Sequence, residues 1–282
     1  MITVVTSKRG GTGCTSLALV YSILLSKQKR KVCMVDLKSN NDIVKLLKIK
    51  TNSSIDNLLS EFGVHNKFSG LEDNICTQGG LDVIPGSVVN MKNYLLTKAS
   101  KIKDLLLILE GRYDDVILDL EDGDLLEVLS REDELNFLKI NVIDQNMLTI
   151  LEYQQLMDSP NFDGFLIVNK MEGNIFPQKR LFTEKFQKGK LFFIPVSSQF
   201  KNNVNREGIT PSSVNNTEVL NSMVAVVNAV LPVINSYNSK INIETSTVDE
   251  GLVFENDKPK EEPKKKKKKG FSFFGLFKKG GK

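Results

Sequence analysis

The chain has 282 residues, of which 40% are hydrophobic and 26% are charged, and its formal net charge is +4. This length suits one large α/β domain with a full core, so no second domain is required. A single histidine, His65, and three cysteines without metal or disulfide spacing argue against histidine catalysis and a histidine-ligated metal, and they favour a reducing cytoplasm.

The charge is divided unevenly between the body of the chain and its last residues. Residues 258–282 hold eleven Lys and two Glu, which sum to +9, so residues 1–257 carry −5. An acidic body offers little to a nucleic-acid backbone, and the basic end is the part expected to seek anions. No secretory apolar segment precedes the first predicted strand and no run of 18 apolar residues occurs, so we expect any membrane contact to be peripheral.

The first predicted elements are a buried strand, a glycine loop and a helix. Residues 2–5 form a short apolar run, and residues 16–26 carry apolar side chains at helical spacing. Between them, Gly13-Cys14-Thr15 occupies the G-K-[ST] position of a phosphate loop, in which glycines turn N–H groups onto phosphates, a lysine neutralises them and a hydroxyl holds Mg²⁺. Two positions depart from this pattern, because Lys8 stands where the first glycine belongs and Cys14 fills the lysine position.

Further along the chain, apolar runs typical of buried strands alternate with helical patterns. The predicted strands are residues 31–37, 81–85, 115–120, 139–143, 165–169 and 191–195. The predicted helices are residues 41–48, 55–62, 94–110, 146–157 and 217–231. This alternation predicts an α/β fold with a doubly wound, mostly parallel sheet and helices on both faces. Ligands bind such sheets at the carboxyl ends of the strands, where the glycine loop, Asp36, Asp119 and Asn169 are expected.

The last predicted helix carries a valine-rich stripe that we interpret as core. From about Ser236 the sequence becomes polar and acidic and then polybasic, which is typical of a linker. The predicted organisation is a domain at residues 1–235, a polar and polybasic linker at 236–269, and an amphipathic membrane-targeting segment at 270–282, the last two forming a disordered tail.

The end of the tail combines lysines with clustered aromatic residues. Its basic residues are Lys264, Lys265, Lys266, Lys267, Lys268 and Lys269. At 100° per residue, one broad apolar face holds Phe271, Phe273, Phe274, Leu276 and Phe277. Such a helix lies in the lipid interface, where polybasic attraction to anionic lipid adds to apolar insertion. A solubilising tail and a nucleic-acid-binding stretch are the alternatives, and an exposed phenylalanine cluster fits neither well.

Several blocks, in the right order, resemble the MinD/ParA family of deviant-Walker P-loop ATPases over roughly residues 1–235. The family loop K-G-G-x-G-K-[ST]-[ST] is similar to residues 9–16, and the family's D-x-D strand end is similar to Asp36-Leu37-Lys38. The other similar blocks are the Walker B strand at 114–123, the asparagine-ended strand at 165–170, the I-P pair at 194–195 and the N-x-x-G-x-P region at 205–211.

The resemblance implies a role for each matching residue. The nucleotide-binding residues it implies are Arg9, Gly10, Gly11, Thr12, Gly13, Cys14, Thr15, Ser16 and Asn169. Thr15 would hold Mg²⁺, Asp36 and Asp119 would be the catalytic carboxylates, and Asn169 would touch the base. In active family members the lysine at the Arg9 position reaches across a dimer to the partner's nucleotide, so the resemblance also implies a homodimer.

The departures fall on the catalytic positions. Cys14 supplies no positive charge, which costs on the order of 10² to 10³ in rate, and Lys38 replaces the second aspartate of D-x-D. We therefore expect weak ATPase activity or none, with Asp36 and Asp119 as remnants. One alternative is that Lys38 or Lys8 swings toward the phosphates and replaces the missing lysine. Another is that Cys14 is a nucleophile of lowered pKa, although a tolerated small residue in a decayed loop is favoured.

The sequence thus predicts a membrane-associated positioning or scaffold protein with a degenerate nucleotide site, by resemblance nearest the TadZ/CpaE branch that localises pilus or secretion machinery. The expected cofactor is ATP or ADP with Mg²⁺. The expected partners are an anionic membrane surface, a second copy of the chain and a protein of a membrane machine, and the expected location is the cytoplasmic face of the cell membrane. The alternatives are an active MinD-like ATPase that cycles on the membrane and a ParA-type DNA partition protein, which the acidic body disfavours.

Overall fold

A computed structural model of the protein describes residues 1–38, 41–65, 70–89, 93–121, 123–131, 134–157, 164–186, 190–215 and 217–249. Met1–Ile241 forms one compact unit, which contains all of the described strands. The predicted membrane-binding residues of the tail lie outside the described residues, as does most of the predicted linker.

The strands of the described residues form one sheet in the order β3-β4-β2-β5-β1-β6-β7-β8. They are β1 (Ile2–Ser7), β2 (Val32–Asp36), β3 (Cys76–Gln78), β4 (Leu81–Ile84), β5 (Asp115–Glu121), β6 (Phe137–Ile143), β7 (Gly164–Met171) and β8 (Leu191–Pro195). All neighbouring pairs are parallel except the edge pair β3 and β4. The predicted doubly wound, mostly parallel sheet is confirmed. Strand β3 was not predicted, because three residues are too few to show a hydrophobic pattern.

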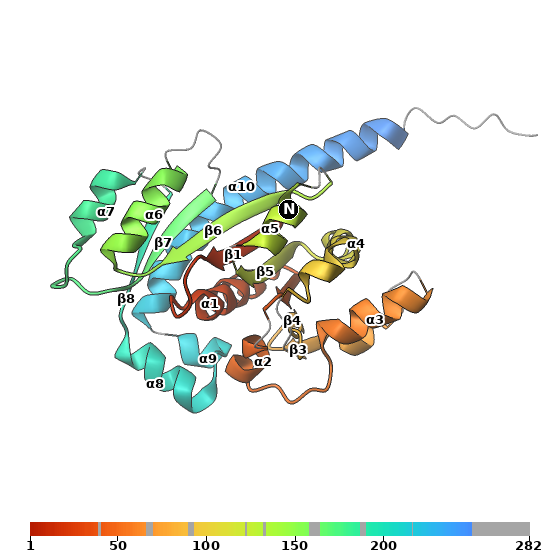
Figure 1. Ribbon diagram of the computed structural model, residues 1–282, viewed down its shortest axis with the longest axis horizontal. Helices are drawn as coiled ribbons and strands as arrows, with labels where there is room; N and C mark the ends of the chain where they lie inside the picture. The colour runs from red at the N-terminus through yellow and green to blue at the C-terminus, as the bar shows by residue number, and fades with distance from the viewer. Residues whose placement is uncertain are drawn as a thin grey trace, which may run out of the picture. The chain divides into compact units, whose positions relative to one another are not determined.

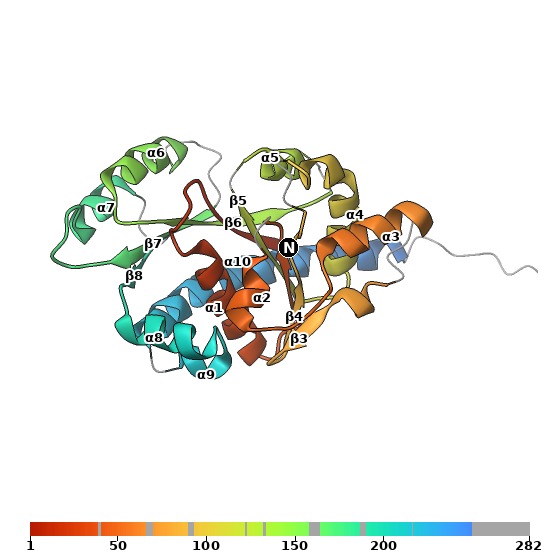
Figure 2. The same cartoon turned by 60° about the horizontal axis from the view of Figure 1, so that its bottom comes forward.

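Helices cover both faces of this sheet (Figures 1 and 2). They are α1 (Cys14–Lys27), α2 (Asp42–Leu47), α3 (Ile55–His65), α4 (Ala99–Glu110), α5 (Asp124–Ser130), α6 (Met147–Met157), α7 (Lys179–Lys185), α8 (Ser198–Glu207), α9 (Pro211–Val214) and α10 (Glu218–Asp249), with the 3₁₀ turns η1 (Glu72–Asn74) and η2 (Leu96–Lys98). Helices α5, α7, α8 and α9 were not predicted. They span three turns at most, and α8 has only two hydrophobic residues, Phe200 and Val204, which are too few to show a helical pattern.

The core has a separate part on each face of the sheet. Along β1, Val5 packs with α1 and α10, whereas the preceding Val4 packs with α3, α4 and α5. A smaller cluster joins α6 and α7 to β6, β7 and β8. Burial on both faces explains why the parallel strands read as continuous apolar runs. The register of β2 and β5 places Asp36 directly opposite Asp119, at the edge of the sheet where the glycine loop leaves β1.

Helix α10 differs in length from its prediction. It runs to Asp249, so residues 236–249 are helical where a linker was predicted. That stretch is polar, but it contains neither Gly nor Pro, the residues that most disfavour a helix interior. The compact unit likewise ends at Ile241, past the predicted boundary at residue 235.

The first part of α10, Glu218–Ser239, is long and apolar enough to cross a membrane by composition, with a mean hydropathy of 1.6. Its apolar stripe nevertheless packs in the core with α1 and the sheet. The buried residues of this stripe are Val219, Met223, Val226, Val227, Val230 and Ile234. This burial supports the interpretation of the stripe as core.

The packing of α10 can be tested by charge substitution. Val230 is fully buried, so Val230→Asp is expected to lower the free energy of unfolding by about 3–5 kcal/mol, because it places an unpaired charge in the core. Val224 lies on the same helix and is 38% exposed, so Val224→Asp should change it by no more than about 1 kcal/mol. Urea denaturation followed by circular dichroism measures both. Equal losses in the two variants would contradict the core position of α10.

Candidate functional site

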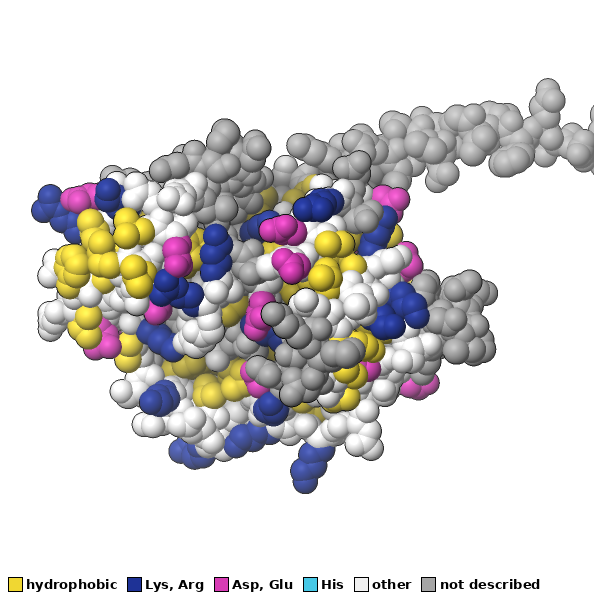
Figure 3. All heavy atoms as spheres, viewed as in Figure 1, with side chains coloured by type: hydrophobic (Ala, Val, Ile, Leu, Met, Phe, Trp, Pro, Cys, Tyr) yellow, Lys and Arg dark blue, Asp and Glu magenta, His cyan; other side chains and the backbone are white. Residues whose placement is uncertain are grey.

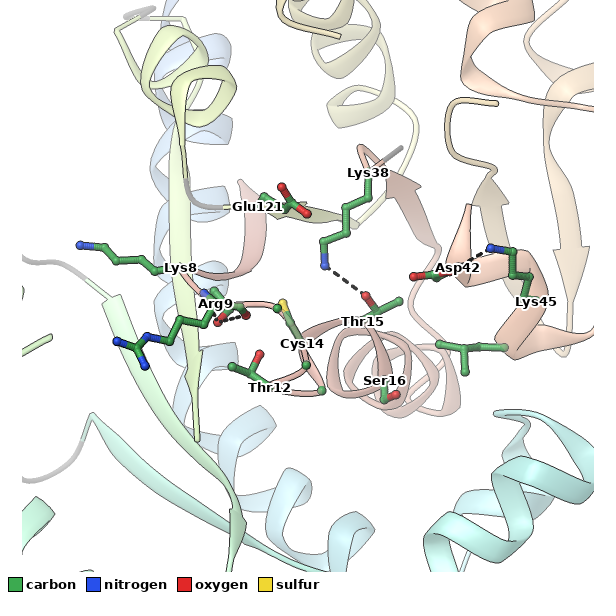
Figure 4. A pocket seen from close by; sticks show the side chains of 15 residues that line it. Lys8, Arg9, Thr12, Cys14, Thr15, Ser16, Lys38, Asp42, Lys45 and Glu121 are labelled. Carbon is green, nitrogen blue, oxygen red and sulfur yellow. Dashed lines mark hydrogen bonds and ion pairs between the residues drawn. The ribbon is translucent and has the colours of Figure 1, made fainter. Parts of the chain in front are cut away.

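The glycine loop joins the end of β1 to the start of α1. Two of its glycines have left-handed backbone conformations, with φ of 78° at Gly11 and 86° at Gly13, and these turns bring the loop back over the first turn of α1. A cavity of about 620 Å³ opens above the loop (Figure 4). It is lined by Ser7, Lys8, Arg9, Gly10, Gly11, Thr12, Gly13, Cys14, Thr15, Ser16, Lys38, Asp42, Lys45, Leu46 and Glu121. Its size is that of a small-molecule site.

The loop is braced from the neighbouring strand β7. The Asn169 amide donates a hydrogen bond to the Thr12 carbonyl at 2.7 Å, and the Lys170 ammonium donates to the Gly11 carbonyl at 2.5 Å. A Cβ on Gly13 would lie only 2.5 Å from Asn169 Nδ2, so the close approach requires glycine. Asn169 therefore positions the loop in this structure, and its contact with a base stays a prediction.

Cys14 lies at the first position of α1 and is 6% exposed. Its thiol donates to Asp119 Oδ1 at 3.7 Å. Burial raises the pKa of this thiol far above its ordinary value, because the thiolate would lose its solvation. A neutral, buried thiol supplies no positive charge to a phosphate and is not an activated nucleophile.

Lys38 follows β2 and reaches across the pocket floor (Figure 4). Its ammonium donates to Asp119 Oδ1 at 2.6 Å and to the Thr15 hydroxyl at 3.1 Å. Burial alone would lower the pKa of Lys38, but the ion pair with Asp119 and the nearby carboxylate of Asp36 raise that pKa. The residue is therefore a fixed positive charge at the bottom of the pocket.

The two predicted catalytic carboxylates lie side by side beneath the loop. Asp36 accepts hydrogen bonds from the backbone N–H groups of Lys38 at 2.9 Å and of Ile43 at 3.4 Å. Burial, reinforced by the charge of Asp119, raises the pKa of Asp36 to about 7. Asp119 is fully buried, and its Oδ2 has no partner among the described residues, so the Lys38 contact is its main compensation.

Arg9 and Lys8 point away from Cys14 (Figure 4). The Arg9 guanidinium binds both carboxylate oxygens of Glu152 on α6, at 2.6 and 3.2 Å. Lys8 lies over the Tyr153 ring at 5.5 Å, and its backbone N–H donates to the Tyr153 hydroxyl. Neither Arg9 nor Lys8 occupies the position of the missing lysine. Of the two lysines proposed to replace it, Lys8 and Lys38, Lys38 is the one that reaches the pocket floor.

Several residues that line the pocket or contact its residues escaped the sequence analysis. Asp42 and Lys45 at the start of α2 form an ion pair at 3.1 Å on the pocket rim, where the Lys45 side chain is 67% exposed. Their three-residue spacing on a predicted helix was a usable signal for an ion pair. Glu152 had none, because no local pattern connects it to Arg9, more than 140 residues earlier in the chain.

The Mg²⁺ implied by the fold does not fit these residues as they are placed. Thr15 Oγ1 and Asp119 Oδ1, the oxygens assigned to the metal and its surroundings, both accept hydrogen bonds from the Lys38 ammonium. Among the described residues, no group of three or more His, Cys, Asp and Glu side chains could hold a metal ion.

Comparison with solved structures shows the fold of this chain. It is similar to the septum site-determining protein MinD from Pyrococcus horikoshii, complexed with Mg-ADP, with a TM-score of 0.63 at 16% identity over 82% of this chain and 96% of that chain. A putative plasmid partition protein from Borrelia burgdorferi bound to AMPPNP gives a TM-score of 0.60 at 19% identity, over 82% of this chain and 98% of that chain. A chain of the MinC:MinD cell division protein complex from Aquifex aeolicus gives a TM-score of 0.59 at 17% identity, over 82% of this chain and 96% of that chain.

These similarities confirm the fold inferred from the sequence blocks, that of the MinD/ParA ATPases. In sequence, no protein-family model and no curated protein matches the chain. The glycines of the phosphate loop are present in this chain, whereas Cys14 and Lys38 replace two charged residues of the family pattern.

The close approach of loop and strand predicts unequal effects for two glycines. Gly13→Ala forces a left-handed residue and a clash with Asn169, so it is expected to lower the free energy of unfolding by at least about 1–2 kcal/mol. Gly10 is the control, since a Cβ there meets nothing within 4 Å and its φ lies outside the left-handed region. Thermal unfolding of both alanine variants measures the difference. If Gly10→Ala is as destabilising as Gly13→Ala, the described loop conformation is wrong.

Proposed function

We propose that the protein is a membrane-associated positioning or scaffold protein of MinD/ParA type, whose phosphate-loop pocket binds ATP or ADP and hydrolyses ATP weakly or not at all. The observation that carries the proposal is the cavity formed by the glycine loop, the start of α1 and the buried ammonium of Lys38. Backbone N–H groups at a helix start and a fixed cation are the groups that bind phosphate. The nucleotides in the similar MinD and partition-protein structures support the same ligand class here.

Weak hydrolysis follows from the charges in the pocket. Electrostatic stabilisation of the transferred phosphoryl group is usually the largest part of this catalysis. Cys14 is neutral, and Lys38 already forms an ion pair with Asp119. Asp119 is the carboxylate that the resemblance places near the attacking water. The site retains groups suited to binding and lacks the family's arrangement for turnover.

Membrane attachment is proposed through the tail. Lys264–Lys269 would attract anionic lipid, and the phenylalanines of residues 271–277 would insert. The protein would then work at the cytoplasmic face of the membrane. The most specific part of the proposal is that the protein positions a pilus or secretion apparatus. This part rests on the resemblance alone.

A homodimer through the face that carries the loop is part of the proposal. Arg9 and Glu152 pair at this face, and both are partly exposed, so a partner can compete for either. Glu152 lies on α6, which also exposes the hydrophobic residues Leu148 and Leu151, and the loop before α7 exposes Ile175 and Phe176. Figure 3 shows hydrophobic side chains gathered over α6 and α7. Exposed patches of this kind mark protein-interaction surfaces.

Nucleotide binding is tested by calorimetry with ATP and ADP on the full-length protein. Gly10 lines the cavity in open space, so Gly10→Asp adds a negative charge to the pocket without a steric conflict and should weaken binding at least about tenfold. Gly10→Asn is the isosteric, neutral control and should bind nearly as well as wild type. Absence of binding at millimolar nucleotide would overturn the proposal. Turnover abolished by Asp119→Asn would favour a working ATPase instead.

Membrane binding is tested by flotation with liposomes that contain anionic lipid. Phe274 lies on the apolar face of the predicted tail helix, so Phe274→Glu should weaken binding at least about tenfold through loss of apolar burial. Ser272→Glu adds the same charge on the polar face and should have a much smaller effect. Equal flotation of wild type and a protein that ends at residue 257 would rule out the tail as the anchor.

A further inference from the structure

The pocket floor holds a cation that belongs to the protein itself. The Lys38 ammonium donates a hydrogen bond to the Thr15 hydroxyl at 3.1 Å (Figure 4). It also donates to Asp119 Oδ1, at 2.6 Å. In phosphate-loop proteins the hydroxyl at the Thr15 position holds Mg²⁺, and a carboxylate at the end of a neighbouring strand lies beside the metal. We propose that Lys38 takes the place of Mg²⁺ in this site, so that the pocket binds the phosphates of a nucleotide without a divalent metal.

The geometry makes the two cations mutually exclusive. Mg²⁺ requires oxygen ligands at about 2.0–2.1 Å in octahedral arrangement. The same two oxygens lie at hydrogen-bonding distances around the Lys38 nitrogen, so a metal bound to both would have to displace the ammonium. The Lys38 side chain is only 13% exposed, which ties its position to the pocket floor.

The charges of the site lead to the same conclusion. Asp119 is fully buried, and Lys38 forms an ion pair with it. A divalent ion beside this ammonium would be repelled strongly, because the surroundings are buried and screen charge poorly. Cys14 is neutral, so Lys38 is the one cation that contacts Asp119 among the described residues.

The ammonium retains the capacity to bind phosphate. It has three N–H donors, and among the described residues Thr15 and Asp119 accept two of them. Lys38 also lines the cavity with the loop glycines, so its remaining donor is available to a phosphate oxygen there. This part of the inference rests on the proposed function, whereas the displacement of Mg²⁺ rests on the protein's own contacts.

The first experiment uses metal alone, with Mn²⁺ as a paramagnetic substitute for Mg²⁺, on the full-length protein. Wild type is expected not to bind Mn²⁺, so the electron paramagnetic resonance spectrum should remain that of the free ion. Lys38→Ala opens Thr15 and Asp119 and should bind one Mn²⁺ per chain. The thermal midpoint of this variant should then rise by roughly 3–5 °C for each tenfold excess of Mg²⁺ over its Kd.

Two further variants serve as controls. Lys38→Arg keeps the positive charge and should exclude Mn²⁺ as wild type does. Lys45→Ala removes an exposed lysine from the rim of the same cavity and should gain no Mn²⁺. Stoichiometric Mn²⁺ binding by wild type, or failure of folded Lys38→Ala to gain it, would overturn the proposal. If Lys38→Ala does not fold, the wild-type result decides.

The second experiment measures ADP binding to wild type in EDTA and in excess Mg²⁺. The two affinities are expected to agree within about threefold. A larger difference would mean that the metal contributes more than about 0.6 kcal/mol to binding. A loss of tenfold or more in EDTA would overturn the metal-free site. If ADP binds under neither condition, the proposed nucleotide function fails, and the Mn²⁺ measurements alone decide whether Lys38 replaces the metal.

Discussion

The constraint on which the rest of the site depends is the burial of two carboxylates at the ends of adjacent parallel strands. Asp36 and Asp119 face each other in the register of β2 and β5, and both are fully buried. Burial removes the hydration of these carboxylates and their like charges repel each other, which is why the pKa of Asp36 rises to about 7. A cation is needed here, and the chain supplies it from Lys38, two residues beyond Asp36.

The two departures from the phosphate-loop pattern can then be understood as one physical change. A lysine at position 14 would start α1 beside Asp119, where the Lys38 ammonium already lies. Two ammonium groups on one buried carboxylate oxygen would repel each other, whereas the small neutral thiol of Cys14 donates a weak hydrogen bond to it. The positive charge has moved from the helix start to the end of β2, and the cation is retained at the pocket floor.

The predictable part of the structure is the part that local sequence determines. Apolar runs located the parallel strands because burial on both faces leaves no polar alternation, and the glycines located the loop because only they adopt its backbone. Helix α10 was predicted too short, since it continues past Pro232 and then through residues 233–249, which are mostly polar but contain neither Gly nor Pro. The pairing of Arg9 with Glu152 and the contact of Asn169 with Thr12 join distant segments, and no periodic pattern records such contacts.

The two rims of the pocket differ in how firmly they are held. The glycine loop is fixed by hydrogen bonds from Asn169 and Lys170 of β7, and the Asn169 contact is buried, so the backbone of the loop is preorganised. Among the described residues, the Arg9 guanidinium is held by a partly exposed ion pair with Glu152, which water and salt weaken. A partner that binds this face can therefore recruit Arg9 at little cost while the loop and the Lys38 cation beneath it stay in place. The surface for a partner can therefore lie next to the ligand pocket, and a partner can bind there without rearranging the pocket floor.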